Sequence, residues 1–120
     1  MSTMSVREYL NENLKPKLPQ EWLVIDYDKT LTNIGRVTAV YVHKTVEPAP
    51  EQGSLLHTVS LVVADPTQAE AAADERLDDH MEDLIPVIQA IPGILFQRAA
   101  KGMRDGFPCW DIELQIKTTS

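Results

Sequence analysis

The chain has 120 residues, 43% of them hydrophobic, so it is long enough for one globular domain over residues 1–120 and too short for two. Its 18 acidic and 11 basic side chains give a formal net charge of −7, which argues against free-standing DNA or RNA binding. No apolar run approaches the roughly 20 residues of a membrane span and the first residues lack the apolar core of a signal peptide, so we expect a soluble, intracellular protein without membrane contact.

Two short elements are predicted near the beginning of the chain. Ser5 followed by Glu8 is a capping-box pattern, which predicts a helix over residues 6–14. Residues 22–25 are a short apolar run of strand-forming side chains that follows two prolines, so we expect a buried strand there. A polar turn is expected over residues 26–35.

A long antiparallel hairpin is predicted next. Two β-rich runs, residues 36–46 and 54–64, are joined by a segment that contains proline and glycine. At about 3.3 Å per residue each strand would be on the order of 36 Å long, well beyond the usual strand of about 5–6 residues. We therefore expect part of the hairpin to project past the core. Within the second run, the face that carries Leu55, His57, Val59, Leu61 and Val63 is the expected core side.

The longest predicted helix follows this hairpin. Asp65 and Pro66 are a helix-start pattern, because aspartate caps free amides and proline at the first position needs no donor. Pro86 is expected to kink or split the helix, and residues 92–93 to end it. Apolar residues at steps of three or four form a stripe that should lie across the sheet: Ala69, Ala73, Leu77, Met81, Leu84 and Ile88.

The last part of the chain, residues 94–117, is predicted as a second hairpin that turns at residues 104–106. In its final strand, Trp110, Ile112, Leu114 and Ile116 alternate with polar residues, as in a half-buried antiparallel strand. The predicted fold class is therefore α+β. It is a single domain of order α-β-β-β-α-β-β, with a mostly antiparallel sheet packed by one long and one short helix.

The negative charge is concentrated in the long helix. Between Asp65 and Asp83 there are eight acidic residues and one basic residue, Arg76, whereas the rest of the chain has ten of each. The expected acidic face is either a solvated surface or one that meets a basic partner or keeps DNA from sticking. A Ca²⁺ site is not expected, because a straight helix fans its carboxylates outward. The acidic face consists of Asp74, Glu75, Asp78, Asp79, Glu82 and Asp83.

The motif Asp26-x-Asp28-x-Thr30 after an apolar strand resembles the first motif of haloacid dehalogenase-like phosphatases. That resemblance implies Asp26 as nucleophile and Asp28 as acid/base, with Mg²⁺ offsetting the clustered charge. Such enzymes carry the motif on a parallel sheet flanked by helices, whereas the following residues here predict a hairpin without a crossover helix. A polar turn is the preferred interpretation, and a small phosphatase is the alternative.

The remaining reactive side chains predict no catalytic, cofactor-binding or metal-binding site. His57 lies on the predicted core face, where a neutral hydrogen-bonded imidazole is expected. The only cysteine, Cys109, excludes an internal disulfide and is expected to be a small strand residue.

As a whole the chain resembles the tail-terminator proteins of long-tailed bacteriophages. The resemblance is carried by the opening helix, the hairpin runs over residues 37–42 and 58–63, the helix through residues 77–79 and 84–85, and the alternating strand over residues 110–116. It implies a hexameric ring that caps the tail tube, stops its polymerisation and offers a surface to the head connector, without catalysis or cofactor. Other small head-tail completion proteins share parts of the pattern and are a second alternative.

This resemblance also implies a place and partners: the head-proximal end of the virion tail, assembled in the host cytoplasm, with a tail tube protein and a head-completion protein as neighbours. DNA would pass through the ring without specific binding, and the acidic face could line that passage. The hairpin tip is the predicted subunit interface. Its residues are Pro48, Ala49, Pro50, Glu51, Gln52 and Gly53.

Overall fold

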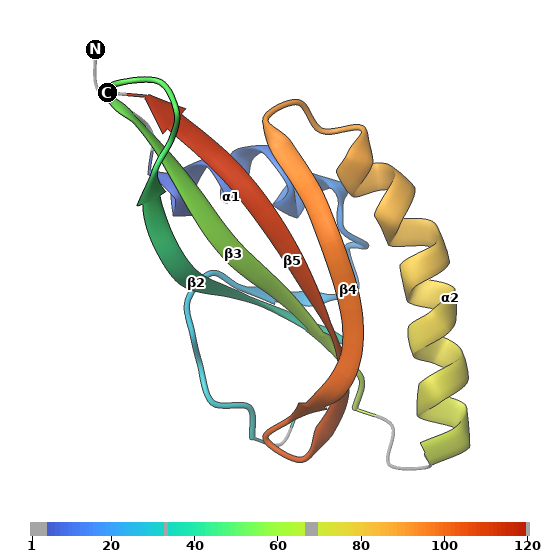
Figure 1. Cartoon of the computed structure of the whole chain (residues 1–120). Helices are drawn as coiled ribbons and strands as arrows, with labels where there is room; N and C mark the ends of the chain where they lie inside the picture. Colours follow the sequence, from blue (N-terminus) through green and yellow to red (C-terminus); the bar gives the residue numbers. More distant parts are fainter. Residues whose placement is uncertain (1–4, 33, 67–69, 120) are drawn as a thin grey trace.

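A five-stranded sheet carries both α-helices on one face (Figure 1). The structure is a computed structural model and describes residues 5–32, 34–66 and 70–119. The elements in chain order are α1 (Val6–Asn13), a short 3-10 helix η1 (Lys15–Lys17), β1 (Leu23–Ile25), β2 (Thr38–Pro48), β3 (Ser54–Ala64), α2 (Glu70–Gln89), β4 (Ile94–Arg104) and β5 (Phe107–Thr119).

The strand order across the sheet is β1-β2-β3-β5-β4, so β3 lies in the centre. Every neighbouring pair is antiparallel except β1 and β2, which are parallel. The predicted α+β class, the element order and the mostly antiparallel sheet are therefore confirmed. The predicted turn of the second hairpin is confirmed as well: Asp105 and Gly106 have φ angles of 51° and 85°, as a tight two-residue turn between twisted strands requires.

Capping at the start of α1 and the proline inside α2 can each be compared with the prediction. The Ser5 side chain accepts a hydrogen bond from the Glu8 amide at 3.1 Å, which satisfies one free donor at the start of α1. The predicted start of α2 at Asp65 and Pro66 adjoins residues 67–69, which lie outside the described residues. Helix α2 runs as one element through Pro86, so of the expected kink or split the split is wrong, and the kink stays a prediction. Just past the end of the helix, the Ala90 amide donates to the Pro86 carbonyl at 3.2 Å.

The main core lies between the sheet and the two helices. The predicted stripe on α2 is confirmed for its described side chains, which are buried against the sheet together with apolar residues of β3, β5 and α1. Ala69 and the side chain of Ala73 lie outside the described part. The buried stripe residues are Leu77, Met81, Leu84 and Ile88.

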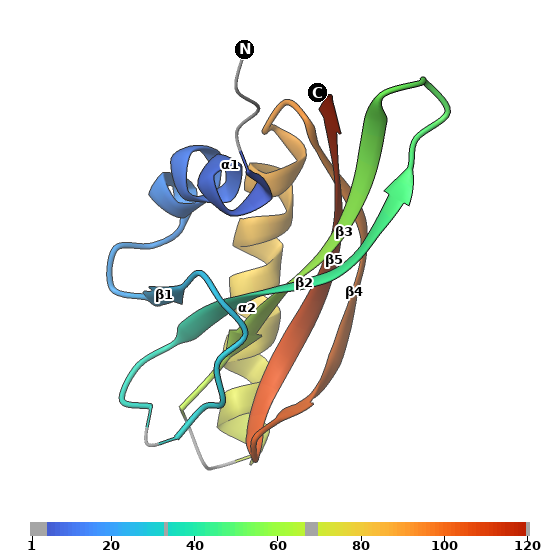
Figure 2. The ribbon, with the colours of Figure 1, turned by 90° about the vertical axis from the view of Figure 1, so that its left-hand side faces the viewer.

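A second, smaller cluster lies on the opposite face of the sheet, where the loop between β1 and β2 covers it. Figure 2 shows this loop in front of the lower part of β2 and β3. The loop brings Leu31 onto Val40, Val62 and Cys109. The sheet is consequently buried on both faces near one end.

The first strand differs from its prediction. We expected a buried strand over residues 22–25, but β1 has only three residues, forms one edge of the sheet and leaves Leu23 37% exposed. Trp22 is the buried residue of this run, and it lies just before the strand. Propensity identified the strand, whereas its place at the edge depends on pairing with β2, which the local sequence does not encode.

The β2–β3 hairpin projects beyond the core, as predicted. In β2 the residues from His43 onward are exposed, and a bulge between His43 and Thr45 shifts the register. On β3 the expected core face is confirmed from His57 to Val63 but not at Leu55, which is 44% exposed. The molecule measures 49 × 26 × 23 Å, and the hairpin tip lies at one end of the long axis (Figure 2).

A buried carboxylate ties α2 to the end of the sheet. Asp65 directly follows β3, is fully buried, and its amide donates to the Pro108 carbonyl at 3.0 Å. Its carboxylate lies 3.4 Å from the Arg76 guanidinium and 3.7 Å from His80 on α2. The His80 ring in turn meets Trp22 edge to face, with the ring centroids 5.2 Å apart.

Replacing this carboxylate should destabilise the fold. We expect Asp65→Asn to lower the free energy of unfolding by about 1–3 kcal/mol, because a buried charge-assisted contact to α2 is lost while the partly exposed Arg76 can be rehydrated. Urea unfolding measures the change. The exposed Asp79→Asn on the same helix is the control and should stay within about 0.5 kcal/mol. Equal effects of the two substitutions would contradict the role given to Asp65.

Candidate functional site

The distal half of the β2–β3 hairpin is the most exposed part of the sheet. Strand β1 pairs only with Thr38–Val40, so within the described chain no strand covers the outer edge of β2 beyond Val40. Val46 and Leu55 are 50% and 44% exposed on the face that carries the main core further along the sheet. An unpaired strand edge beside exposed apolar side chains is a surface on which another chain can dock.

The tip of this hairpin is an ordered turn. The Ala49 amide donates to the Ser54 carbonyl at 3.0 Å, and the Ser54 amide donates to the Glu51 carbonyl at 3.1 Å. Gly53 has a φ of 83°, a left-handed conformation that glycine adopts without strain. Glu51 pairs with Lys117 of β5, and this hydrogen bond lowers the pKa of the Glu51 carboxyl. The predicted interface residues Pro48–Gly53 thus form a defined projection, and their contact with a neighbour stays a prediction.

Two histidines link three strands at the base of the exposed segment. His43 Nε2 lies 3.0 Å from His57 Nδ1, and His57 Nε2 lies 2.8 Å from the Thr118 hydroxyl. Burial, and then the nearby His43, lowers the pKa of His57, which agrees with the predicted neutral imidazole. The third histidine, His80, is on α2 against Trp22, so the fold does not bring the three together.

All six residues of the predicted acidic face on α2 are exposed, but their charges are not equally free. Lys101 of β4 lies 2.5 Å from an Asp74 oxygen and 2.6 Å from an Asp78 oxygen. These two contacts raise the pKa of Lys101. Sequence reasoning missed this lysine, because nothing local to either element signals that β4 runs beside α2. Within the acidic face, the residues without an ion pair among the described residues are Glu75, Asp79, Glu82 and Asp83.

The carboxylates of the phosphatase-like motif have different partners. Asp26 accepts a hydrogen bond from Asn11 of α1 at 2.9 Å, whereas Asp28 pairs with Arg104 at the end of β4. The neighbouring Asp105 accepts the Leu31 amide at 2.7 Å. The Asp28 and Asp105 contacts fasten the loop after β1 to the β4–β5 turn, whereas the Asp26 contact joins this loop to α1.

Two other titratable groups, the Tyr41 hydroxyl and the Cys109 thiol, are buried in the sheet. The Tyr41 hydroxyl is buried without a hydrogen-bond partner among the described residues, and burial together with Asp26 raises its pKa. It lines a cavity of about 160 Å³ that also contains Asp26 and His43. Burial raises the pKa of Cys109 to about 11, so its thiol stays protonated and the prediction of a small strand residue is confirmed.

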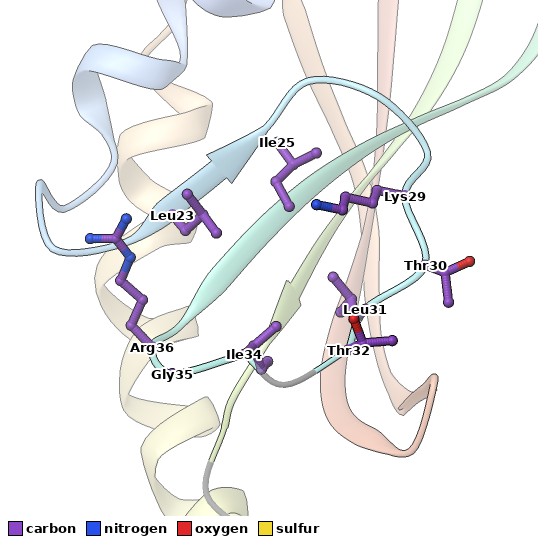
Figure 3. A pocket seen from close by; sticks show the side chains of 9 residues that line it. All are labelled: Leu23, Ile25, Lys29, Thr30, Leu31, Thr32, Ile34, Gly35 and Arg36. Carbon is purple, nitrogen blue, oxygen red and sulfur yellow. The ribbon is translucent and has the colours of Figure 1, made fainter.

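Two open hollows lie elsewhere on the surface. One, of about 380 Å³, is lined by β1 and the loop that leads to β2, and Lys29 and Arg36 are among its lining residues (Figure 3). The other, of about 430 Å³, is a groove between α2 and Trp110 of β5. The Trp110 indole donates to the Leu77 carbonyl at 2.9 Å, which fixes this wall of the groove.

No protein-family model matches the chain, and no curated protein matches it. Among the described residues, no three or more His, Cys, Asp or Glu side chains are grouped as a metal ion would require. The helices in the described part include none that is both long and apolar enough to cross a membrane. The features of the molecule that bear on function are the hairpin, the acidic face and the two hollows.

We expect the folded protein to lose stability as the pH falls, because the pKa of His57 is lowered by folding. Because the pKa of His57 is lowered from 6.5 in the folded protein, the unfolded chain takes up a proton at a higher pH than the folded one. The stabilising contribution is complete above about pH 6.5 and is lost as the pH falls from there toward the folded pKa.

His57→Gln should therefore flatten the dependence of unfolding free energy on pH between about pH 7 and about pH 5, measured by urea unfolding. The control, His80→Gln, should keep the part of the slope that His57 causes. A slope that is the same in wild type and His57→Gln would contradict the assignment.

Proposed function

We propose that the protein is a structural virion assembly protein, a tail terminator of a long-tailed bacteriophage. It forms a hexameric ring on the head-proximal end of the tail tube, stops polymerisation of the tube and provides the surface that joins the head connector. Its partners are further copies of itself, a tail tube protein and a head-completion protein. It carries out no catalysis and uses no cofactor.

The observation that carries this proposal is the projecting half of the β2–β3 hairpin. A strand edge that no described strand covers, beside Val46 and Leu55, is an aggregation hazard for a protein that works alone. In a ring, the same edge and apolar side chains are covered by a neighbouring copy, so the exposure is removed on assembly. An extended segment that adds to a strand edge gains main-chain hydrogen bonds along its length.

The acidic face supports the same proposal in a second way. A ring through which DNA passes has to present a surface that does not hold phosphate groups. Acidic side chains repel the DNA backbone, and the ones on α2 that lack an ion pair within the described chain are the candidates for this surface.

Acidic substitution of the exposed apolar residues should prevent assembly without unfolding the chain. We expect Val46→Asp with Leu55→Asp to weaken self-association at least about tenfold, which corresponds to about 1.4 kcal/mol. Sedimentation velocity and native mass spectrometry measure the association, and circular dichroism checks the fold. Met103→Asp, at an equally apolar position that is 68% exposed on β4 far from the tip, is the control. Assembly that survives in the double variant, or fails equally in the control, would contradict the proposal.

Neutralising the free acids should make the assembled protein retain DNA. We expect Glu75→Gln with Asp79→Asn and Asp83→Asn to bind double-stranded DNA several-fold more tightly at low salt, with the difference shrinking as salt is added. Fluorescence anisotropy with a labelled duplex measures it. Glu8→Gln with Glu12→Gln on α1 and Glu21→Gln before β1 removes the same three charges at exposed positions elsewhere and should change little. DNA binding unchanged in the α2 variant would remove the acidic face from the proposed function.

A further inference from the structure

The hollow beside β1 combines apolar walls with two cations, Lys29 and Arg36. Leu23 and Ile25 of β1 and Leu31 and Ile34 of the loop form the apolar part. Figure 3 shows these side chains between Lys29 on one side and Arg36 on the other. Neither cation has an ion pair among the described residues, and Asp28, which precedes Lys29, pairs with Arg104. Lys29–Thr32 together with Ile34–Arg36 is called the basic loop below.

The groove between α2 and β5 has the complementary chemistry. Its apolar walls come from α2 and from the Trp110 ring, and its charged side chains are both acidic. Lys101 lies 5.4 Å from the Trp110 ring centroid, which shows that a cation is accommodated against this indole. The lining residues of the groove are Asp78, Met81, Glu82, Ile85, Pro86 and Trp110.

The two hollows lie at opposite edges of the sheet. The strand order places β1 at one edge and β4 at the other, and α2 packs on β4 and β5. In Figure 1 the loop after β1 and helix α2 accordingly lie on opposite sides of the molecule. Two different, complementary surfaces on opposite sides of one chain produce a head-to-tail contact, and such a contact closes into a ring when the rotation between copies allows it.

We propose that the groove between α2 and β5 of one copy receives the basic loop of the next copy. The inference rests on the proposed ring and names the contact that would close it. Lys29 and Arg36 pair across the interface with Glu82, which has no ion pair among the described residues, and with Asp78, which Lys101 of its own chain also contacts. The exposed Leu23 meets the apolar wall formed by Ile85 and Pro86.

A second copy matches the groove better than nucleic acid does. The groove is acidic and the chain as a whole carries −7, so the phosphate backbone is repelled. The cations that lack an ion pair within the described chain all lie in its first part, and one of them, Lys17, lines a hollow together with Asp83 of the acidic face. These cations are Arg7, Lys15, Lys17, Lys29 and Arg36. The chain thus carries the complement of its own groove on its opposite side.

Charge reversal on each side of the contact tests the proposal. Lys29→Glu with Arg36→Glu makes a chain whose loop and groove are both acidic, and Asp78→Lys with Glu82→Lys makes one whose loop and groove are both basic. Each variant alone should lose self-association at least about tenfold relative to wild type. Mixed in equal amounts, the two should assemble again, because each loop then meets a groove of opposite charge, and the rings should hold equal numbers of both chains.

Matched variants control for net charge and folding. Lys15→Glu with Lys17→Glu carries the same charge change as the loop variant, and Glu8→Lys with Glu12→Lys the same change as the groove variant. Both should associate like wild type. Self-association is measured in solution at millimolar concentration by sedimentation velocity and native mass spectrometry, with circular dichroism to confirm that each chain is folded.

Several outcomes would overturn the contact. These are a wild-type chain that stays monomeric at millimolar concentration, single variants that assemble like wild type, and a mixture that does not recover. A groove variant that loses attachment to tail tubes while the loop variant keeps it would assign the groove to a basic partner protein instead. If the charge variants assemble and only Val46→Asp with Leu55→Asp fails, this contact is wrong and the ring proposal stands. If no version assembles even on tail tubes, the proposed function itself is wrong.

Discussion

The packing of α2 across β4 and β5 is the contact on which the rest of the molecule depends. The apolar stripe of the helix, from Leu77 to Ile88, is buried against the sheet, and the Trp110 indole donates a hydrogen bond to the Leu77 carbonyl. Because that face of α2 packs against the sheet, the acidic residues on the opposite face point into the solvent. The same packing forms the groove beside Trp110 and places Lys101 against Asp74 and Asp78. The charge distribution of the surface is therefore a consequence of core packing.

The extent of the helices also determines which part of the sheet is exposed to solvent. The two helices cover the core face up to the level of His57, and the loop after β1 covers only the far end of the opposite face. The hairpin strands of eleven residues each are longer than this covered region. Among the described elements, strand pairing with β3 and β5 holds the segment from Val46 to Leu55, and neither helix covers it. An oligomer that covers it gains apolar burial without any change in the fold of the subunit.

Sequence patterns predicted those elements whose burial follows from local periodicity. The alternation in β5, the α2 stripe and the turn at Asp105 and Gly106 each need only neighbouring residues to be recognised. Contacts between distant segments were not predictable in this way. Arg104 holds Asp28 from a position 76 residues further along the chain, and Lys101 reaches back to α2 from β4. The loop after β1 was expected to be a polar turn, yet Leu31 makes it the cover of a second apolar cluster.

We propose that this subunit completes its surface only in a ring at the end of a tail tube. Electron microscopy of phage tail tubes incubated with the purified chain is the direct test. We expect a hexameric ring on one end of each tube, with the β2–β3 hairpin covered by a neighbouring copy and the tube no longer able to grow. Tubes with bare ends that continue to polymerise beside a monomeric chain would contradict it.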